Sequence, residues 1–241
     1  MSTTQNIQKQ IGKLADGTMF KYEQLAIAPE EFSAAAKAIE RLIAKDIIKR
    51  ASTGIFYKPQ KTIFGELKPN EQEILKLYLF EKGKRIAYIT GTSLYNRLGL
   101  TTQIPNNIKI ASRNKRITIS MGNVNASPAK SYVDVNDKNF YLLELLDALK
   151  DFKKIPDLDK NSAIKILSQK LKELNLTEIK LLIKCGLAYP PRVRAFLGAL
   201  LENIKTETGL TVLKTSLNPV SEYDYGIDKK QLPNMKNWNI K

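Results

Sequence analysis

Histidine is absent from this sequence of 241 residues, and cysteine occurs once, as Cys185. Without an imidazole, the chain has no histidine general acid or base, no serine–histidine triad and no imidazole metal ligand. A single cysteine permits neither an internal disulfide nor a thiolate zinc cluster, and Cys185 lies in an apolar helical pattern typical of a small core residue. We therefore expect a protein that is not an enzyme, with no catalytic residues, no metal and no cofactor.

Long apolar runs are also missing, because no segment approaches the roughly 20 residues that span a bilayer. The first six residues have neither the basic nor the apolar region of a secretion signal. Since 43% of the residues are hydrophobic, a packed core is expected, and the length permits two domains of about 100 to 150 residues. These features predict a soluble cytoplasmic protein with no membrane partner.

Acidic residues are scarce, and their distribution is uneven. The chain has 39 Lys and Arg against 24 Asp and Glu, which gives a net charge of +15. Residues 82–133 contain nine cations and no carboxylate. A basic surplus favours a polyanionic partner such as nucleic acid, although genome composition alone also produces lysine-rich chains. The candidates for a second-domain basic patch, which would extend a DNA footprint or bind a toxin, RNA or nucleotide, are Lys84, Arg85, Arg97, Lys109, Arg113, Lys115 and Arg116.

Among the patterns that are present, the clearest lies between Pro29 and Pro59. Apolar residues at three- and four-residue spacing predict an amphipathic helix, and Pro29 followed by two glutamates suits its start. Two short strand patterns, 47–50 and 54–58, follow around a tight turn at Gly54. A helix near 7–14, a strand at 18–20 and a brief helix at 22–26 precede them, which is the order of a winged helix-turn-helix. We predict this fold over residues 1–60, with a buried stripe of Phe32, Ala35, Ala36, Ile39, Leu42 and Ile43.

The cations and hydroxyls of this segment predict contacts with double-stranded DNA. Residues 33, 37 and 41 lie on the helix face opposite the apolar stripe, where a recognition helix meets base edges in the major groove. A basic hairpin beside it suits the flanking phosphates or the minor groove. An ordinary surface role is the alternative for each residue. The predicted DNA-binding residues are Ser33, Lys37 and Arg41 on the helix, and Lys49, Arg50, Ser52, Thr53 and Lys58 in the wing.

The rest of the chain predicts a linker and a second domain. Residues 61–70 predict a linker that docks through Phe64. Residues 71–241 predict a mixed α/β domain, with strands at 86–89, 108–111, 116–121 and near 132–133, and with helical periodicity from Phe140 onward. The fold class expected from the sequence is thus α+β, with an N-terminal winged helix-turn-helix followed by a mixed α/β domain whose C-terminal half is helical.

Five segments give the chain a resemblance to the AbiEi-like antitoxins over nearly its whole length. They are GIFYKP at 54–59, FGELKP at 64–69, ITGTSLYNRLGLTTQIP at 89–105, YPPRVRA at 189–195 and SLNP at 216–219. The resemblance implies a bacterial type IV toxin–antitoxin system, in which a winged-helix domain binds the promoter of a two-gene operon and represses it. It also implies that residues 71–241 oppose a cognate toxin, often without a tight complex. Relatives in this family can bind DNA as monomers, whereas many winged-helix repressors pair, so the oligomeric state stays open.

Two alternatives of a different class stay open. The turn at Gly91 into a short helix can hold a phosphate, which a nucleotidyltransferase or nuclease would combine with paired carboxylates around Mg²⁺. The nearest following carboxylates, Asp134 and Asp137, are equally helix N-caps, so this alternative requires a carboxylate pair that converges near Gly91 to Ser93 in the fold. The other alternative is an RNA- or protein-binding module that uses residues 82–133, for which the wing cations would be dispensable.

Overall fold

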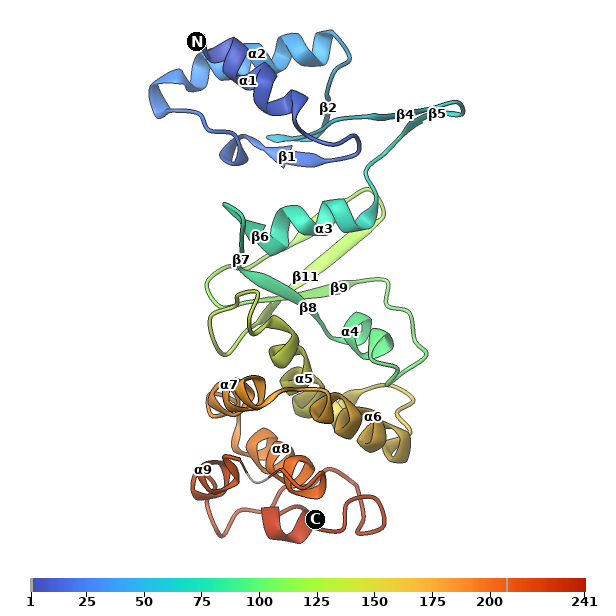
Figure 1. Ribbon diagram of the computed structural model, residues 1–241. Coiled ribbons are helices and arrows are strands. Elements are labelled where there is room, and N and C mark those ends of the chain that lie inside the picture. The colour runs from blue at the N-terminus through green and yellow to red at the C-terminus, as the bar shows by residue number, and fades with distance from the viewer. Residues whose placement is uncertain (1, 207) are drawn as a thin grey trace. The chain divides into compact units, whose positions relative to one another are not determined.

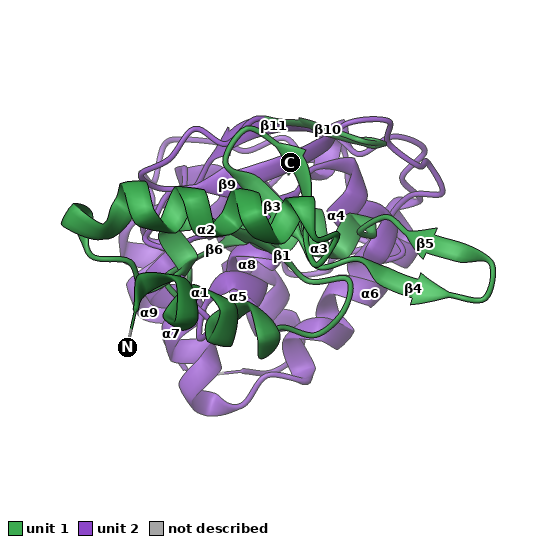
Figure 2. Ribbon diagram, turned by 90° about the horizontal axis from the view of Figure 1, so that it is seen from above, with its two compact units in different colours: residues 1–85, 119–125 green, residues 86–118, 126–241 purple. Residues whose placement is uncertain are grey.

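The computed structural model describes residues 2–206 and 208–241, and its architecture is mixed α+β (Figure 1). The helices and several small sheets divide between two compact units (Figure 2). Unit 1 comprises the chain up to Arg85 together with 119–125, and unit 2 comprises 86–118 and 126–241. The sequence-based boundaries at 60 and 70 stay a prediction. Within the described residues, no helix combines the length and the apolar character that a membrane span requires.

Unit 1 begins with helices and strands that share one hydrophobic cluster. Its elements are α1 (Thr3–Gly12), β1 (Met19–Lys21), the 3₁₀ helices η1 (Tyr22–Gln24) and η2 (Pro29–Glu31), α2 (Phe32–Ala44), β2 (Lys49–Ser52) and β3 (Ile55–Tyr57). Helix α1 starts at a capping box, in which Ser2 and Gln5 each accept a hydrogen bond from the other's backbone amide. The three strands form an antiparallel sheet in the order β1-β3-β2.

Helix α2 buries one face because small and branched apolar residues recur at helical spacing. Ala35, Ile39 and Leu42 are buried as predicted, and Ala38 joins them. The alanines leave room for α1 to pack closely against this face. The expectation that Phe32 is buried is wrong: the side chain is 51% exposed, because the first residue of the helix lies at the edge of the cluster, with its ring 5.2 Å from that of Tyr22.

The remainder of unit 1 up to Arg85 consists of two hairpins and a helix. These are β4 (Gln60–Thr62) with β5 (Gly65–Leu67), α3 (Glu71–Leu79), and β6 (Phe80–Glu81) with β7 (Lys84–Arg85). The β4–β5 hairpin covers most of the predicted linker and projects from the rest of unit 1 (Figures 1 and 2). The expectation that Phe64 docks is wrong, because its side chain stands at the turn of this projecting hairpin and is 94% exposed.

Unit 2 contains β8 (Ala87–Thr90), β9 (Ile108–Ser112) and, from Ala126 onward, β11 (Val124–Lys130), which pair in a small mixed sheet. Strand β9 is central, parallel to β11 and antiparallel to β8. The six-residue helix α4 (Thr92–Arg97) follows β8, and β10 (Ile119–Met121), which belongs to unit 1, precedes β11. The sequence pattern missed β11, because this strand contains Pro128 and small residues that are typical of loops. The strand expected near 132–133 is not formed, and these residues lie in a bend.

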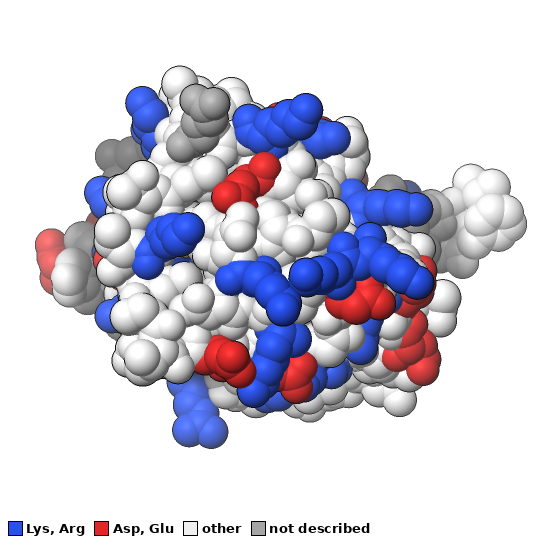
Figure 3. All heavy atoms as spheres, turned by 90° about the horizontal axis from the view of Figure 1, so that it is seen from below, with Lys and Arg blue, Asp and Glu red and all other residues white. Residues whose placement is uncertain are grey.

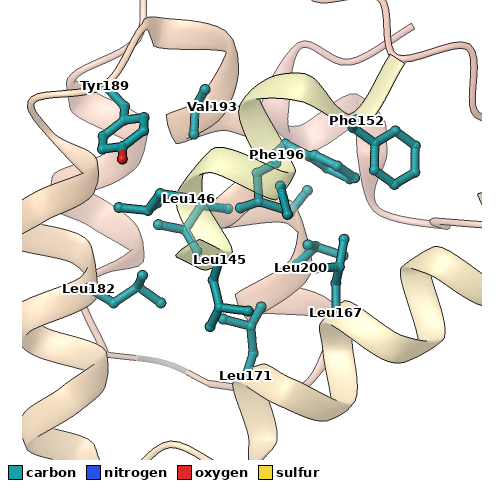
Figure 4. Packing of buried hydrophobic residues seen from close by; sticks show 14 of the residues in the cluster. Leu145, Leu146, Phe152, Leu167, Leu171, Leu182, Tyr189, Val193, Phe196 and Leu200 are labelled. Atoms are coloured by element: carbon teal, nitrogen blue, oxygen red, sulfur yellow. The ribbon is translucent and has the colours of Figure 1, made fainter. Parts of the chain in front are cut away.

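The helical second half predicted from residue 140 is present. It comprises α5 (Phe140–Asp151), η3 (Phe152–Lys154), α6 (Lys160–Lys172), α7 (Leu176–Gly186), α8 (Pro191–Asn203), α9 (Leu210–Thr215) and η4 (Met235–Trp238). All residues of α8 from Ala195 to Leu201 are buried, as expected for a helix surrounded by other elements. Figure 4 shows Phe196 and Leu200 of α8 packed among side chains of α5, α6 and η3. This core is the main support of unit 2.

Candidate nucleic-acid interface

Helix α2 presents Ser33, Lys37 and Arg41 to solvent, on the side opposite its buried residues. The four-residue spacing aligns the three side chains along the helix. Because the buried face shares one cluster with α1 and the β-sheet, the exposed face is fixed relative to the sheet. No ion pair of Lys37 or Arg41 is found among the described residues. An anionic partner could therefore bind these two cations without first breaking an ion pair within the protein.

The β2–β3 hairpin, which follows this helix in the chain, exposes Arg50, Ser52 and Thr53. Gly54 closes the turn with a φ of +72°, which a residue without a side chain adopts readily. The pairing of the two strands shifts between Arg50 and Ser52, a β-bulge that locally re-aims the edge strand. The Arg50 guanidinium lies 5.8 Å from the centre of the Phe56 ring. The predicted wing thus displays a guanidinium and two hydroxyls, which are suitable donors to phosphate.

Two other predicted DNA-binding residues are engaged inside unit 1. The Lys49 ammonium pairs with Glu66 and lies 3.4 Å from an Asp46 oxygen, and the hydrogen bond to Glu66 raises the pKa of Lys49. The Lys58 ammonium donates to the Leu14 carbonyl at 2.9 Å and lies 3.0 Å from the Asp16 carboxylate. Lys49 thus ties β2 to β5, and Lys58 ties β3 to the loop after α1.

The seven residues of the predicted second-domain patch do not all belong to the same unit. Lys84 and Arg85 lie on β7 in unit 1, whereas the other five lie in unit 2. Arg97 is paired, since its Nη2 lies 2.6 Å from Oε1 of Glu144. Lys109 is exposed on the central strand β9. The seven predicted residues are thus divided between the two units.

The remaining three, Arg113, Lys115 and Arg116, line a shallow groove of about 380 Å³ together with Lys130. Because β9 and β11 are parallel, both end at this edge of the sheet. Nη1 of Arg113 donates to the Tyr132 carbonyl at 2.9 Å, which holds that guanidinium at the groove. As far as the structure describes the groove, its lining contains no carboxylate. By contrast, the face shown in Figure 3 has acidic side chains interspersed among its basic ones.

Comparison with known proteins places this chain in a family. Residues 6–176 match DUF6088, which is described as a family of unknown function. The chain belongs to the DUF6088 family. No curated protein matches the sequence. Among solved structures, the crystal structure of the RV2827C protein from Mycobacterium tuberculosis has a similar fold, with a TM-score of 0.51 and 11% sequence identity over 92% of this chain and 85% of that chain.

In this DUF6088 protein, two carboxylates of α5 approach the residues that flank the Gly91 turn. Asp147 Oδ2 accepts a hydrogen bond from Thr90 at 2.7 Å, and Asp151 Oδ2 accepts one from Tyr95 at 2.7 Å. The Asp147 side chain is buried, and the described part of the chain contains no cluster of three or more histidine, cysteine, aspartate or glutamate residues that would hold a metal ion. The expected N-cap role of Asp134 or Asp137 is wrong, because α5 begins after Asn139.

The oxygens of Asp147 are occupied by donors from several elements of unit 2. Oδ2 also accepts from Tyr88 at 3.0 Å, and Oδ1 accepts from Lys150 at 2.7 Å and from Tyr189 at 3.3 Å. Burial, and then the Asp147 charge, raises the pKa of both tyrosines, so both stay protonated donors. Burial lowers the pKa of Lys150, but Asp147 more than offsets it, so the ammonium stays charged. Sequence reasoning missed this cluster, since an aspartate within a helix gives no sign of its partners.

Proposed function

We propose that this chain is a DNA-binding autoregulator, and that residues 2–58 act as its winged helix-turn-helix. The element order α1, β1, η1, η2, α2, β2, β3 and the sheet order β1-β3-β2 support this interpretation. In it, α2 is the recognition helix and the β2–β3 turn is the wing. Helix α2 has 13 residues and is therefore about 20 Å long. The major groove, which is about 12 Å wide, admits an α-helix.

The observation that carries the proposal is the pair of exposed cations on the outer face of α2, for which the described residues 2–206 and 208–241 provide no ion-pair partner. Lys37 and Arg41 lie one turn apart, and Ser33 precedes them by another turn. Arginine or lysine can contact guanine edges, whereas the serine hydroxyl can contact a base or phosphate. Arg50, Ser52 and Thr53 would then bind the flanking backbone.

We further propose that the regulated operon encodes a toxin, and that unit 2 opposes its effect. Support comes from the five segments that resemble AbiEi-like antitoxins, three of which lie in unit 2. Co-expression with the neighbouring gene tests this part. Growth arrest by the neighbour alone, relieved by this chain, is the expected result. A neighbour without toxicity, or toxicity that the chain does not relieve, would refute the antitoxin role and leave the DNA-binding role standing.

Direct binding tests the DNA-binding role. The protein is titrated with the duplex upstream of its own gene and with an unrelated duplex of equal length, at several salt concentrations. We expect a preference for the upstream duplex that a Lys37→Ala, Arg41→Ala variant loses, with the slope of log affinity against log salt reduced by about 2. The matched control is Lys180→Ala, Lys184→Ala, which removes two exposed cations at the same spacing from α7. Equal, weak, salt-sensitive binding to both duplexes would refute the proposal.

A second candidate function is RNA binding through the groove at the ends of β9 and β11. The observation that favours it is the concentration of four cations in a groove without a carboxylate. A double variant, Arg113→Ala, Arg116→Ala, separates the two candidates. Loss of RNA binding in this variant, with no effect of the Lys37→Ala, Arg41→Ala variant, would favour the groove over α2.

A further inference from the structure

The tip of the β4–β5 hairpin displays two large apolar side chains to solvent. Ile63 is 93% exposed and Phe64 is 94% exposed, and both stand at the turn between the strands. Burial of apolar side chains away from water is favourable, so an isoleucine and a phenylalanine that are exposed side by side suggest a binding role. The hairpin projects from unit 1 in both ribbon views (Figures 1 and 2), which makes its tip accessible to a partner.

The turn also departs from the usual chemistry of two-residue hairpin turns, where glycine, asparagine and aspartate dominate. Here the Thr62 hydroxyl supports the turn instead. It donates to the Gly65 carbonyl at 2.7 Å and accepts from the Phe64 amide at 3.2 Å. Gly65, with a φ of +111°, takes the conformation that other residues avoid. The tip is therefore braced, and local turn preference does not explain its two apolar residues.

The base of the hairpin is tied to the segment that carries the proposed DNA-binding elements. Glu66 of β5 pairs with Lys49 of β2, and Nζ of Lys61 lies 3.9 Å from an oxygen of Asp46, just after α2. Glu66 is the sole acidic residue between positions 58 and 70, and Lys49 neutralises it. The exposed Lys61 lies within β4 and the exposed Lys68 directly follows β5, so the hairpin carries a cation on or next to each strand.

We propose that Ile63 and Phe64 form an apolar wedge that enters the minor groove and inserts at a base step flanking the site read by α2. This inference rests on the proposed DNA-binding function. Proteins that insert such a wedge use one or two apolar side chains and partly unstack the step, which matches the size of this tip. Lys61 and Lys68 would meet the phosphates on either side. A stable protein interface needs about 1,000 Å² or more of buried surface, far more than a two-residue tip provides.

The experiment uses the full chain and the duplex upstream of its own gene. A fluorescent adenine analogue is placed at successive base steps on both sides of the sequence that the protein protects from nuclease cleavage. The wild-type protein is expected to raise the fluorescence at one flanking step, which reports unstacking. An Ile63→Ala, Phe64→Ala variant should lose that signal and bind about tenfold more weakly, equivalent to about 1.4 kcal/mol. Its salt dependence should stay unchanged, because no charge is removed. A separate Phe64→Leu variant, which keeps an apolar side chain at this position, should retain most of the wild-type affinity.

Controls separate failure of the wedge from failure of the DNA-binding function. Ile104→Ala, Val220→Ala removes two apolar side chains of similar exposure, 86% and 85%, and should leave binding and fluorescence unchanged. If the tip variant binds and unstacks like the wild type while Lys37→Ala, Arg41→Ala abolishes the preference, the wedge alone is overturned. A reduced salt slope for the tip variant would also overturn it. If the wild-type protein shows no preference for the upstream duplex, both proposals fall.

Discussion

Removal of the Asp147 carboxylate should destabilise unit 2 strongly. Asp147 is 0% exposed and joins α5 to β8 through Tyr88 and Thr90, and to the loop before α8 through Tyr189. In an Asp147→Ala variant, the Lys150 ammonium would lose its partner at 2.7 Å. The buried hydroxyls of Tyr88, Thr90 and Tyr189 would lose their acceptor at the same time.

The size of the effect follows from these contacts. Breaking a buried ion pair by removing one partner costs about 3 to 5 kcal/mol, and each hydroxyl left without an acceptor costs about 1 to 3 kcal/mol. These terms are not additive within one network, and Lys150 can turn toward Asp151, whose Oδ2 lies 3.7 Å away. We therefore expect a loss of about 4 kcal/mol, a large part of the 5 to 15 kcal/mol that is typical of a folded domain.

Urea unfolding followed by the fluorescence of Trp238, the single tryptophan, measures this loss within unit 2. Asp147→Asn keeps the shape and one acceptor, so its loss should be smaller, about 1 to 3 kcal/mol. The control is Glu222→Gln, whose ion pair with Lys241 is 64% exposed at both side chains and should contribute little to stability, because solvent screens it. A loss below about 1 kcal/mol for Asp147→Ala would refute the reasoning. A fully stable Asp147→Asn protein that had lost a phosphate-transfer activity would instead favour the enzyme alternative.

Three further predictions concern unit 2. A β-carbon at Gly198 would overlap the six-membered ring of Trp238. Gly198→Ala should therefore lower the free energy of unfolding by about 1 to 2 kcal/mol, although alanine has the better helix propensity. Greater stability of this variant in urea would contradict the prediction. Burial raises the pKa of Glu202, but hydrogen bonds from Asn234, Trp238 and Asn237 outweigh it and hold the pKa below 4.5. The ionised Glu202 side chain therefore stabilises the fold above about pH 4.5, and this stabilisation is lost as the pH falls through the lower pKa of the folded state. The midpoint of acid unfolding, followed by Trp238 fluorescence, should shift in Glu202→Gln and not in Glu222→Gln. The Cys185 thiol is 5% exposed, and burial raises its pKa despite Lys184, so it should react with a thiol reagent only after unfolding; fast reaction of the folded protein would refute this.

Local periodicity was sufficient to predict the buried face of an element where the residues of that element alone determine which side is buried. The stripe through Ala35, Ile39 and Leu42 identifies the inner face of α2, and hence the outer position of Lys37 and Arg41. The same reasoning failed at Phe32, because a residue at the end of a helix can leave the core without disturbing the repeat. It failed again at β11, where Pro128 and small side chains conceal a strand that is held by its neighbour β9.

Other features depended on residues far apart in the chain. Pro59, Gly65 and Pro69 suit a linker as well as a hairpin, and the hairpin is fixed by pairing of β4 with β5 and by the Lys49–Glu66 ion pair. The neighbours of a lysine in space likewise decide whether it faces solvent or pairs with a carboxylate. The number of charges in the sequence does not reveal these neighbours. This distinction separates Lys37 from Lys49 and Lys58.

The sequence by itself determined the basic character of the chain, its mixed α+β composition, the amphipathic α2 and the helical second half, because each depends on composition or on residues within a few turns. Only the tertiary structure decided that Phe64 is exposed at a braced tip and that Asp147 is buried beneath four donors. Both outcomes depend on which distant segments meet. The free energy of a side chain is set by those neighbours as much as by its own chemistry.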